Sequence, residues 1–249
     1  MKHGEYLFKV RSYECGANGE ATLPAICNYL QEAASLHAEE LGFSKSDFDA
    51  AGGNISWVLT RLAVKVVRYP KWEEEVSVET FPRGGRKIVA WRDFIVRDSA
   101  GETIALATSE WMVIDLASRK MEAIPARVLG CVDENPESVL GPEPFTPRLK
   151  FPGDVESGSE RHTFRAQFSH IDLNGHVNNV HYIEWLLEPL AGEGPEEIEV
   201  VFRSETLAGD EVGVVAAPGE TAAETLLCVS SPDGKVHAVA RVRSHRSRL

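Results

Sequence analysis

An internal repeat limits the folds that are open to this chain. The dipeptide Asn18-Gly19 recurs 156 residues later as Asn174-Gly175. At the same offset Thr22 aligns with Asn178, and both are residue types that cap helix N-termini. An apolar run at helical spacing follows in each copy. Because the turn, the cap and the helix coincide, we interpret the chain as a duplicated unit.

Each copy is expected to contain one long helix and a set of antiparallel strands. In the first copy the helix follows Thr22 and ends near Leu41, with Gly42 as its C-cap. Alternating or β-branched segments predict strands at residues 6–10, 57–67, 75–81, 88–96 and 103–114. The last two strands are joined by Asp98-Ser99-Ala100-Gly101, which is typical of a hairpin.

The pattern is interrupted and then restarts. Prolines, glycines and acids gather between residues 125 and 158 with little periodicity, as in a linker or covering loop. The second copy predicts a buried helix within residues 177–190 and strands at 162–168, 197–203, 211–216, 225–230 and 236–243. We therefore predict an N-terminal domain of residues 1–125, a linker of residues 126–158 and a C-terminal domain of residues 159–249.

The order of elements predicts an α+β fold in which two antiparallel sheets each wrap one long buried helix. We expect the two sheets to join as a pseudo-dimer, because pairing removes an exposed edge from each. With two such units in one chain, a monomer and a homodimer are both open.

Composition and charge exclude several classes of function. Of the 249 residues, 43% are hydrophobic and 26% are charged, as in ordinary globular proteins. The net charge of −12 argues against nucleic acid or an anionic membrane as a partner. No stretch approaches membrane-spanning length and the N-terminus has no apolar signal core, so we expect a cytoplasmic protein. Reduced cysteines, mostly in the core, are expected at positions 15, 27, 131 and 228.

A polar motif distinguishes the second copy from the first. Asp172, Asn174 and His176 alternate with spacers just before the buried helix, whereas Glu20 aligns with His176 in the first copy. Asn-Gly favours a turn, so these residues are predicted in a tight loop at a helix N-terminus. Backbone N–H groups, the helix dipole and an imidazole there suit stabilisation of an oxyanion. We expect chemistry in the second copy and binding or scaffolding in the first.

The segment DLNGHVNNVHYIEW, residues 172–185, resembles the signature of the acyl-acyl-carrier-protein thioesterases, the plant chain-terminating enzymes and their bacterial relatives. A second segment, VFRSET at residues 201–206, resembles the strand of that family that carries a Glu. The resemblance covers nearly the whole chain and implies a tandem (double) hot-dog fold. It further implies an enzyme that releases fatty acid from acyl carrier protein without metal or other cofactor. The acyl chain would be bound by the N-terminal half.

The same resemblance carries the catalytic Asp, Asn, His and Glu of the family onto Asp172, Asn174, His176 and Glu205. The family often has Cys where this chain has Thr206, so a water nucleophile is more economical here than a cysteine acyl-enzyme. We expect Glu205 and His176 to orient and deprotonate water. Asn174 would hold the water or the carbonyl, and Asp172 would fix the loop or the tautomer of His176. Backbone N–H groups near residues 177–179 are expected to bind the oxyanion.

Other interpretations of the same residues stay open. An acyl-CoA thioesterase would use the same chemistry on another thiol carrier. A hot-dog hydratase or dehydratase, or a non-catalytic acyl-binding module, are less favoured alternatives. His176 and His181 have a spacing that suits a metal, but no third ligand accompanies them.

Two basic segments are candidates for contact with an acidic partner, and for both the alternative is a solvated surface. Arg83, Arg86 and Lys87 are expected in a loop beside Gly84-Gly85, where they would contact acyl carrier protein. A basic C-terminal tail is expected from the arginines at positions 241, 243, 246 and 248.

Overall fold

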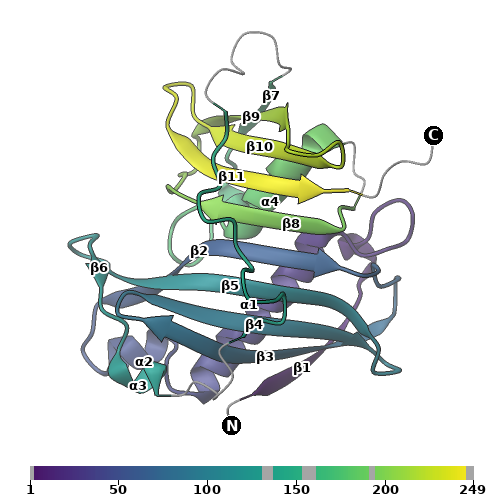
Figure 1. Ribbon diagram of the computed structural model, residues 1–249. Helices are drawn as coiled ribbons and strands as arrows, with labels where there is room; N and C mark the ends of the chain where they lie inside the picture. The colour runs from purple at the N-terminus through teal and green to yellow at the C-terminus, as the bar shows by residue number, and fades with distance from the viewer. Residues whose placement is uncertain (1–2, 131–136, 153–160, 191–193, 245–249) are drawn as a thin grey trace. The chain divides into compact units, whose positions relative to one another are not determined.

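The computed structural model describes residues 3–130, 137–152, 161–190 and 194–244 of the chain. The chain divides into two compact units, Met1–Pro144 and Phe145–Leu249 (Figure 1). Their boundary lies inside the predicted linker, parts of which fall outside the described residues. No helix among the described residues is long and apolar enough to cross a membrane.

The N-terminal unit is an antiparallel sheet with one long helix packed on it. The strands follow the order β1-β3-β4-β5-β2, and β6 pairs with β5 at one end. The strands are β1 (Gly4–Lys9), β2 (Ile55–Val66), β3 (Glu75–Arg86), β4 (Val89–Asp98), β5 (Thr103–Asp115) and β6 (Met121–Glu122). The helices are the 3₁₀ turn η1 (Ser12–Glu14), α1 (Leu23–Glu40), α2 (Lys45–Ala50) and α3 (Ala126–Leu129).

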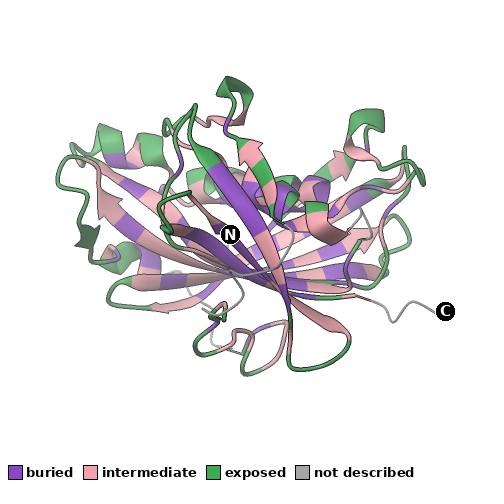
Figure 2. Cartoon of the chain, turned by 90° about the horizontal axis from the view of Figure 1, so that it is seen from above, coloured by how far each residue is buried: buried purple, intermediate pink, exposed green. Residues whose placement is uncertain are grey.

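Helix α1 begins and ends where the sequence predicts. The hydroxyl of Thr22 accepts the Ala25 N–H at 3.3 Å, and Pro24 stands in the first turn. Gly42 follows the helix with a φ of 73°, which glycine adopts without a Cβ clash. Helix α1 packs on β3 and β1. Along β3, buried Val76 and Val78 alternate with more exposed neighbours. Figure 2 shows buried and less buried positions along the strands of the chain.

The C-terminal unit repeats this plan with a shorter helix. Its strands follow the order β8-β11-β10-β9-β7, all antiparallel, and the helix packs on β10. The strands are β7 (His162–Arg165), β8 (Glu197–Phe202), β9 (Glu211–Pro218), β10 (Glu224–Ser230) and β11 (Val236–Arg243). The helix is α4 (Asn179–Leu187), preceded by the 3₁₀ turn η2 (Phe168–His170) and followed by the 3₁₀ turn η3 (Glu188–Leu190).

The predicted strand at residues 162–168 is wrong in its second half. Strand β7 ends at Arg165, and the chain then turns through η2. The ring nitrogen Nδ1 of His170 accepts the Gln167 N–H at 3.1 Å. This local hydrogen bond closes a turn and competes with a longer strand.

The prediction of a basic C-terminal tail is also wrong for its first two arginines, Arg241 and Arg243. Both lie on β11, where Arg241 contacts Glu199 at 3.3 Å and Arg243 pairs with Glu197. Their charges are therefore partnered within the sheet. Positions 246 and 248 lie outside the described residues.

Backbone hydrogen bonds at equivalent positions of the two copies support the duplication. In both copies a glycine with positive φ closes the loop before the helix, Gly19 at 77° and Gly175 at 82°. Two backbone hydrogen bonds of the first copy have equivalents in the second, and all four are 2.9 Å long. The bond from the Gly16 N–H to the Glu20 carbonyl corresponds to that from the Asp172 N–H to the His176 carbonyl. The bond from the Thr22 N–H to the Glu14 carbonyl corresponds to that from the Asn178 N–H to the His170 carbonyl. The two loops are thus the same structure with different side chains.

Candidate active site

The polar motif forms a tight loop between η2 and α4, as the sequence predicts. The Asp172 N–H donates to the His176 carbonyl at 2.9 Å, and the Gly175 N–H donates to the Asp172 carbonyl at 3.0 Å. Asn178 then caps α4, since its side-chain oxygen accepts the Val180 N–H at 2.9 Å.

The carboxylate of Asp172 accepts hydrogen bonds from within the loop itself. One oxygen accepts the Asn174 N–H at 2.8 Å and the other accepts the Asn174 amide at 3.4 Å. Among the described residues, no hydrogen bond joins this carboxylate to the His176 ring. Of the two roles expected for Asp172, the geometry favours holding the loop over fixing the imidazole tautomer.

The loop places His176 against Glu205, which comes from the segment after β8. The distance from His176 Nε2 to Glu205 Oε2 is 3.1 Å, and the side chains are 24% and 42% exposed. An ionised carboxylate can only accept, so the proton of a neutral imidazole lies on Nε2 and its lone pair on Nδ1. Two residues 29 positions apart in the sequence thus form one partly exposed acid–base pair.

The expected oxyanion donors are wrong at two positions. The Val177 N–H donates to the Thr206 carbonyl at 3.0 Å, and the Asn178 N–H donates to the His170 carbonyl at 2.9 Å. Both groups therefore tie the loop to its neighbours. Asn179, the first residue of α4, has no intrahelical acceptor for its N–H by helix geometry, and Asn174 carries an exposed amide.

No described cysteine is suited to act as a nucleophile. Burial raises the pKa of the Cys27 thiol to about 12 and that of Cys228 to about 11. Cys228 lies in an apolar cluster with Leu149 and Val239. Cys15 is half-buried and its pKa is also raised by burial. A thiol needs a lowered pKa to attack at neutral pH. Cys131 lies outside the described residues.

The Thr206 hydroxyl contacts His237 inside the C-terminal unit. Its side chain is fully buried, and its Oγ1 lies 3.1 Å from the Nδ1 of His237, a residue on β11 that is 3% exposed. Sequence reasoning missed His237. The available signal was a single histidine within the apolar strand VHAVARV.

The possible histidine metal pair does not form. His176 faces Glu205, whereas His181 Nδ1 lies 2.6 Å from Glu184 and its ring packs against His170 with centroids 4.5 Å apart. Burial, and then the charge of His181, lower the pKa of His170. In the described part of the chain, no group of three or more His, Cys, Asp or Glu residues is placed to hold a metal ion.

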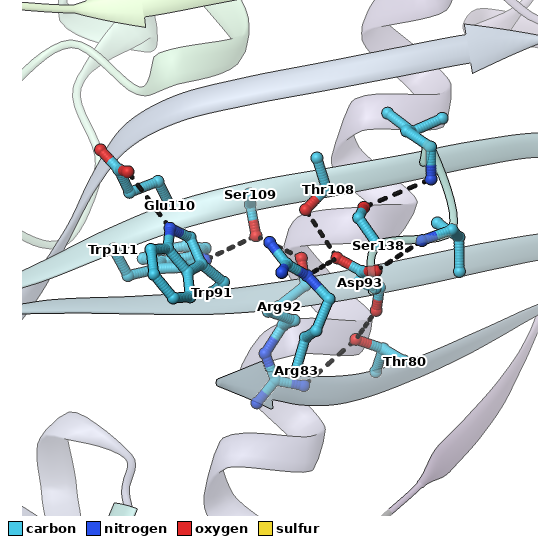
Figure 3. A network of polar contacts seen from close by, with 12 residues as sticks. Thr80, Arg83, Trp91, Arg92, Asp93, Thr108, Ser109, Glu110, Trp111 and Ser138 are labelled. Carbon is cyan, nitrogen blue, oxygen red and sulfur yellow. Dashed lines mark hydrogen bonds and ion pairs between the residues drawn. The ribbon is translucent and has the colours of Figure 1, made fainter. Parts of the chain in front are cut away.

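The expected basic loop in the N-terminal unit is wrong at Arg83. Strand β3 continues through Arg86 with a register shift between Pro82 and Gly84. Arg83 is 8% exposed, and its Nε donates to the fully buried carboxylate of Asp93 at 3.1 Å (Figure 3). The guanidinium groups of Arg83 and Arg86 also lie over the Trp91 ring, 5.2 and 5.6 Å from its centroid. Arg83 is therefore a structural residue.

Comparison with known proteins identifies the family. The model of the acyl-ACP thioesterase N-terminal domain matches residues 3–131, and that of the C-terminal domain matches residues 154–243. The oleoyl-acyl carrier protein thioesterase 2, chloroplastic, of Arabidopsis thaliana is 35% identical over 208 residues, 77% of this chain and 54% of the relative. A palmitoyl-acyl carrier protein thioesterase, chloroplastic, from the same plant is 34% identical over 189 residues, 73% of this chain and 45% of the relative. The chain spans about half the length of the curated relatives it matches.

Solved structures agree on the fold. The crystal structure of an acyl-ACP thioesterase from Bacteroides thetaiotaomicron matches with a TM-score of 0.84 and 27% identity, and covers 97% of both chains. The 12:0-ACP thioesterase from Umbellularia californica matches in fold with a TM-score of 0.83 and 23% identity, covering 97% of this chain and 93% of that one. The predicted α+β double hot-dog fold is confirmed. The chain therefore belongs to the acyl-ACP thioesterase family.

Proposed function

We propose that this chain hydrolyses the thioester of fatty acyl-acyl carrier protein and releases free fatty acid and the carrier thiol. The observation that carries the proposal is the 3.1 Å contact between His176 and Glu205 in a loop of this family's signature. The names of the curated relatives, oleoyl- and palmitoyl-acyl carrier protein thioesterases, support the substrate class.

His176 is the general base in this proposal. Its Nδ1 lone pair removes a proton from water while the water oxygen attacks the thioester carbonyl carbon. The C–S bond of the tetrahedral intermediate then breaks, and the proton passes to the leaving thiolate. Glu205 stabilises the imidazolium through Nε2–H. General-base assistance of this kind contributes roughly 10²–10⁴-fold.

Asn174 and Asp172 complete the site. The exposed amide of Asn174 donates to the substrate carbonyl or orients the water, while Asp172 fixes the loop through the two hydrogen bonds it accepts from Asn174. One oxyanion donor contributes about 10²–10³-fold. The N-terminal unit holds the acyl chain, with α1, β2 and β4 as the lining elements.

Kinetics on two thiol carriers test the substrate class. We expect thiol release from acyl carrier protein to exceed release from the matching acyl-CoA by at least about tenfold in kcat/KM. A series of acyl lengths on the carrier would report chain-length preference. The reverse preference would favour an acyl-CoA thioesterase. Binding of acyl thioester without thiol release would favour a binding module, and water addition to an enoyl thioester would favour a hydratase.

A further inference from the structure

Glu205 lies where no strand holds it. Strand β8 ends at Phe202, whose partner Ala238 is the last pair of the β8–β11 ladder. Residues 203–207 then run without regular structure. Contacts made by the residues around Glu205 therefore help to fix the position of its carboxylate.

His237 contacts the residues on both sides of Glu205. Its Nδ1 lies 3.2 Å from Ser204 Oγ, 3.3 Å from the Ser204 carbonyl oxygen and 3.1 Å from Thr206 Oγ1. The His237 carbonyl also accepts the Arg203 N–H at 2.8 Å. One residue of β11 thus contacts Arg203, Ser204 and Thr206 of the segment that carries Glu205.

The protonation of His237 follows from these partners. The Ser204 carbonyl can only accept, and the Ser204 hydroxyl donates to the Val236 carbonyl at 2.8 Å. Nδ1 must therefore carry the proton. Burial lowers the pKa of His237, so the ring stays neutral and Nε2 is unprotonated. Nε2 is buried without a hydrogen-bond partner among the described residues, so the polar contacts of the ring are made by Nδ1.

Thr206 connects this segment to the loop of His176. Its carbonyl accepts the Val177 N–H at 3.0 Å, and Val177 directly follows His176. Its hydroxyl faces His237, and its side chain is fully buried. Thr206 therefore touches both the residue that anchors Glu205 and the loop that carries its partner.

We propose that His237 and Thr206 are positioning residues that hold the Glu205 carboxylate opposite His176. This inference rests on the proposed function of the His176–Glu205 pair. The alternative role, Thr206 as a nucleophile activated by His237, requires a hydroxyl that reaches substrate, whereas this hydroxyl is fully buried.

Matched substitutions separate positioning from packing. Thr206→Val removes the hydroxyl at nearly constant volume, whereas Thr206→Ser keeps it. His237→Leu removes the Nδ1 donor, His237→Asn restores a donor near the same place, and His237→Gln places its amide near Nε2 instead. Thr225→Val, at a half-buried position of β10, is the control for the chemical change. Circular dichroism and thermal unfolding show which variants are folded.

We expect Thr206→Val and His237→Leu to lower kcat on acyl carrier protein by about 10-fold or more, with KM within about twofold. In these variants the Glu205 carboxylate would no longer be held where it stabilises the His176 imidazolium. Thr206→Ser and His237→Asn should recover most of the loss, and His237→Gln should not. In a Glu205→Gln background, Thr206→Val should cost less than about twofold, since coupled residues are not additive. Wild-type turnover in Thr206→Val, full additivity with Glu205→Gln, or an acyl adduct on Thr206 in quenched enzyme would overturn the inference.

A second measurement does not depend on turnover. The ¹⁵N resonance of His176 Nε2 reports its hydrogen bond to Glu205. We expect Thr206→Val to move this resonance toward its position in Glu205→Gln, and a resonance at the wild-type position would contradict the inference. An inactive wild type would refute the proposed function alone, because the resonance still tests the positioning.

Discussion

At the level of single residues, the polar side chains of the candidate site have different hydrogen-bond partners and therefore different roles. Asp172 is used by the loop, Glu205 by His176, and His237 by the segment around Glu205. The residue that most resembles a nucleophile by position, Thr206, is turned inward. His176 and Glu205, which we propose carry the chemistry, are both partly exposed.

The buried His237 gives the C-terminal unit a predictable response to pH. Burial is the main cause that lowers its pKa below the ordinary histidine value of about 6.5, and the nearby Lys235 adds to it. The unfolded chain therefore binds a proton more readily than the folded one, and stability is lost as pH falls through and below about 6.5. His237→Asn removes this contribution.

We expect the free energy of unfolding of His237→Asn to fall less than that of the wild type between neutral and mildly acidic pH. Urea unfolding of both proteins at two pH values measures the difference. Equal falls would show that the proton affinity of His237 does not change on unfolding.

At the scale of elements, the N-terminal sheet depends on a buried ion pair. Asp93 of β4 accepts from Arg83 of β3, from the Thr108 hydroxyl of β5 at 2.6 Å and from the Val139 N–H at 2.8 Å (Figure 3). One carboxylate thus joins three neighbouring strands and the segment that follows them.

Asp93→Ala should therefore destabilise the protein strongly. It leaves the Arg83 charge buried without its carboxylate, which typically costs about 3–5 kcal/mol. Thr108→Val removes one hydrogen bond to the same charged carboxylate and should cost less, about 1.5–3 kcal/mol. Chemical denaturation of the two variants measures both values. A loss for Asp93→Ala no larger than that for Thr108→Val would contradict a structural role of the pair.

The long elements could be predicted from sequence because each carries its own local signals. Thr22 and Asn178 mark helix starts, and alternation marks the strands of both sheets. Short elements were missed, since α2 has only six residues and no extended periodicity. The end of β7 depends on a side chain, His170, that closes a turn, and no pattern of hydrophobic residues encodes that bond.

Much of the site was predicted as well, and its errors share one cause. The motif and the family resemblance named His176 and Glu205, whose side chains lie 3.1 Å apart in the structure. They could not show that the Val177 and Asn178 N–H groups are used by Thr206 and His170, or that Arg83 is paired with Asp93. Such partners are distant in sequence, so only the folded chain shows which donors and acceptors are already taken.

At the level of the whole molecule, the two copies of the duplicated unit can be compared with each other. The same loop geometry stands before α1 and before α4, yet Glu20 occupies the position of His176. The Ala21 N–H of the first copy donates to the Pro70 carbonyl, and the equivalent Val177 N–H of the second copy donates to the Thr206 carbonyl. Pro70 therefore corresponds to Thr206, and Tyr69, the residue before Pro70, corresponds to Glu205. We therefore propose that the C-terminal copy carries the chemistry and that the N-terminal copy binds the acyl chain.

The most direct test measures thiol release from acyl carrier protein for the wild type, His176→Ala and Glu20→Ala. The two substitutions truncate side chains at aligned positions of the two equivalent loops, so their structural effects are comparable. We expect His176→Ala to lower kcat by about 10²–10⁴-fold and Glu20→Ala to stay within about threefold of the wild type. Near-wild-type turnover in His176→Ala, or an equal loss in both variants, would contradict the assignment of catalysis to the C-terminal copy.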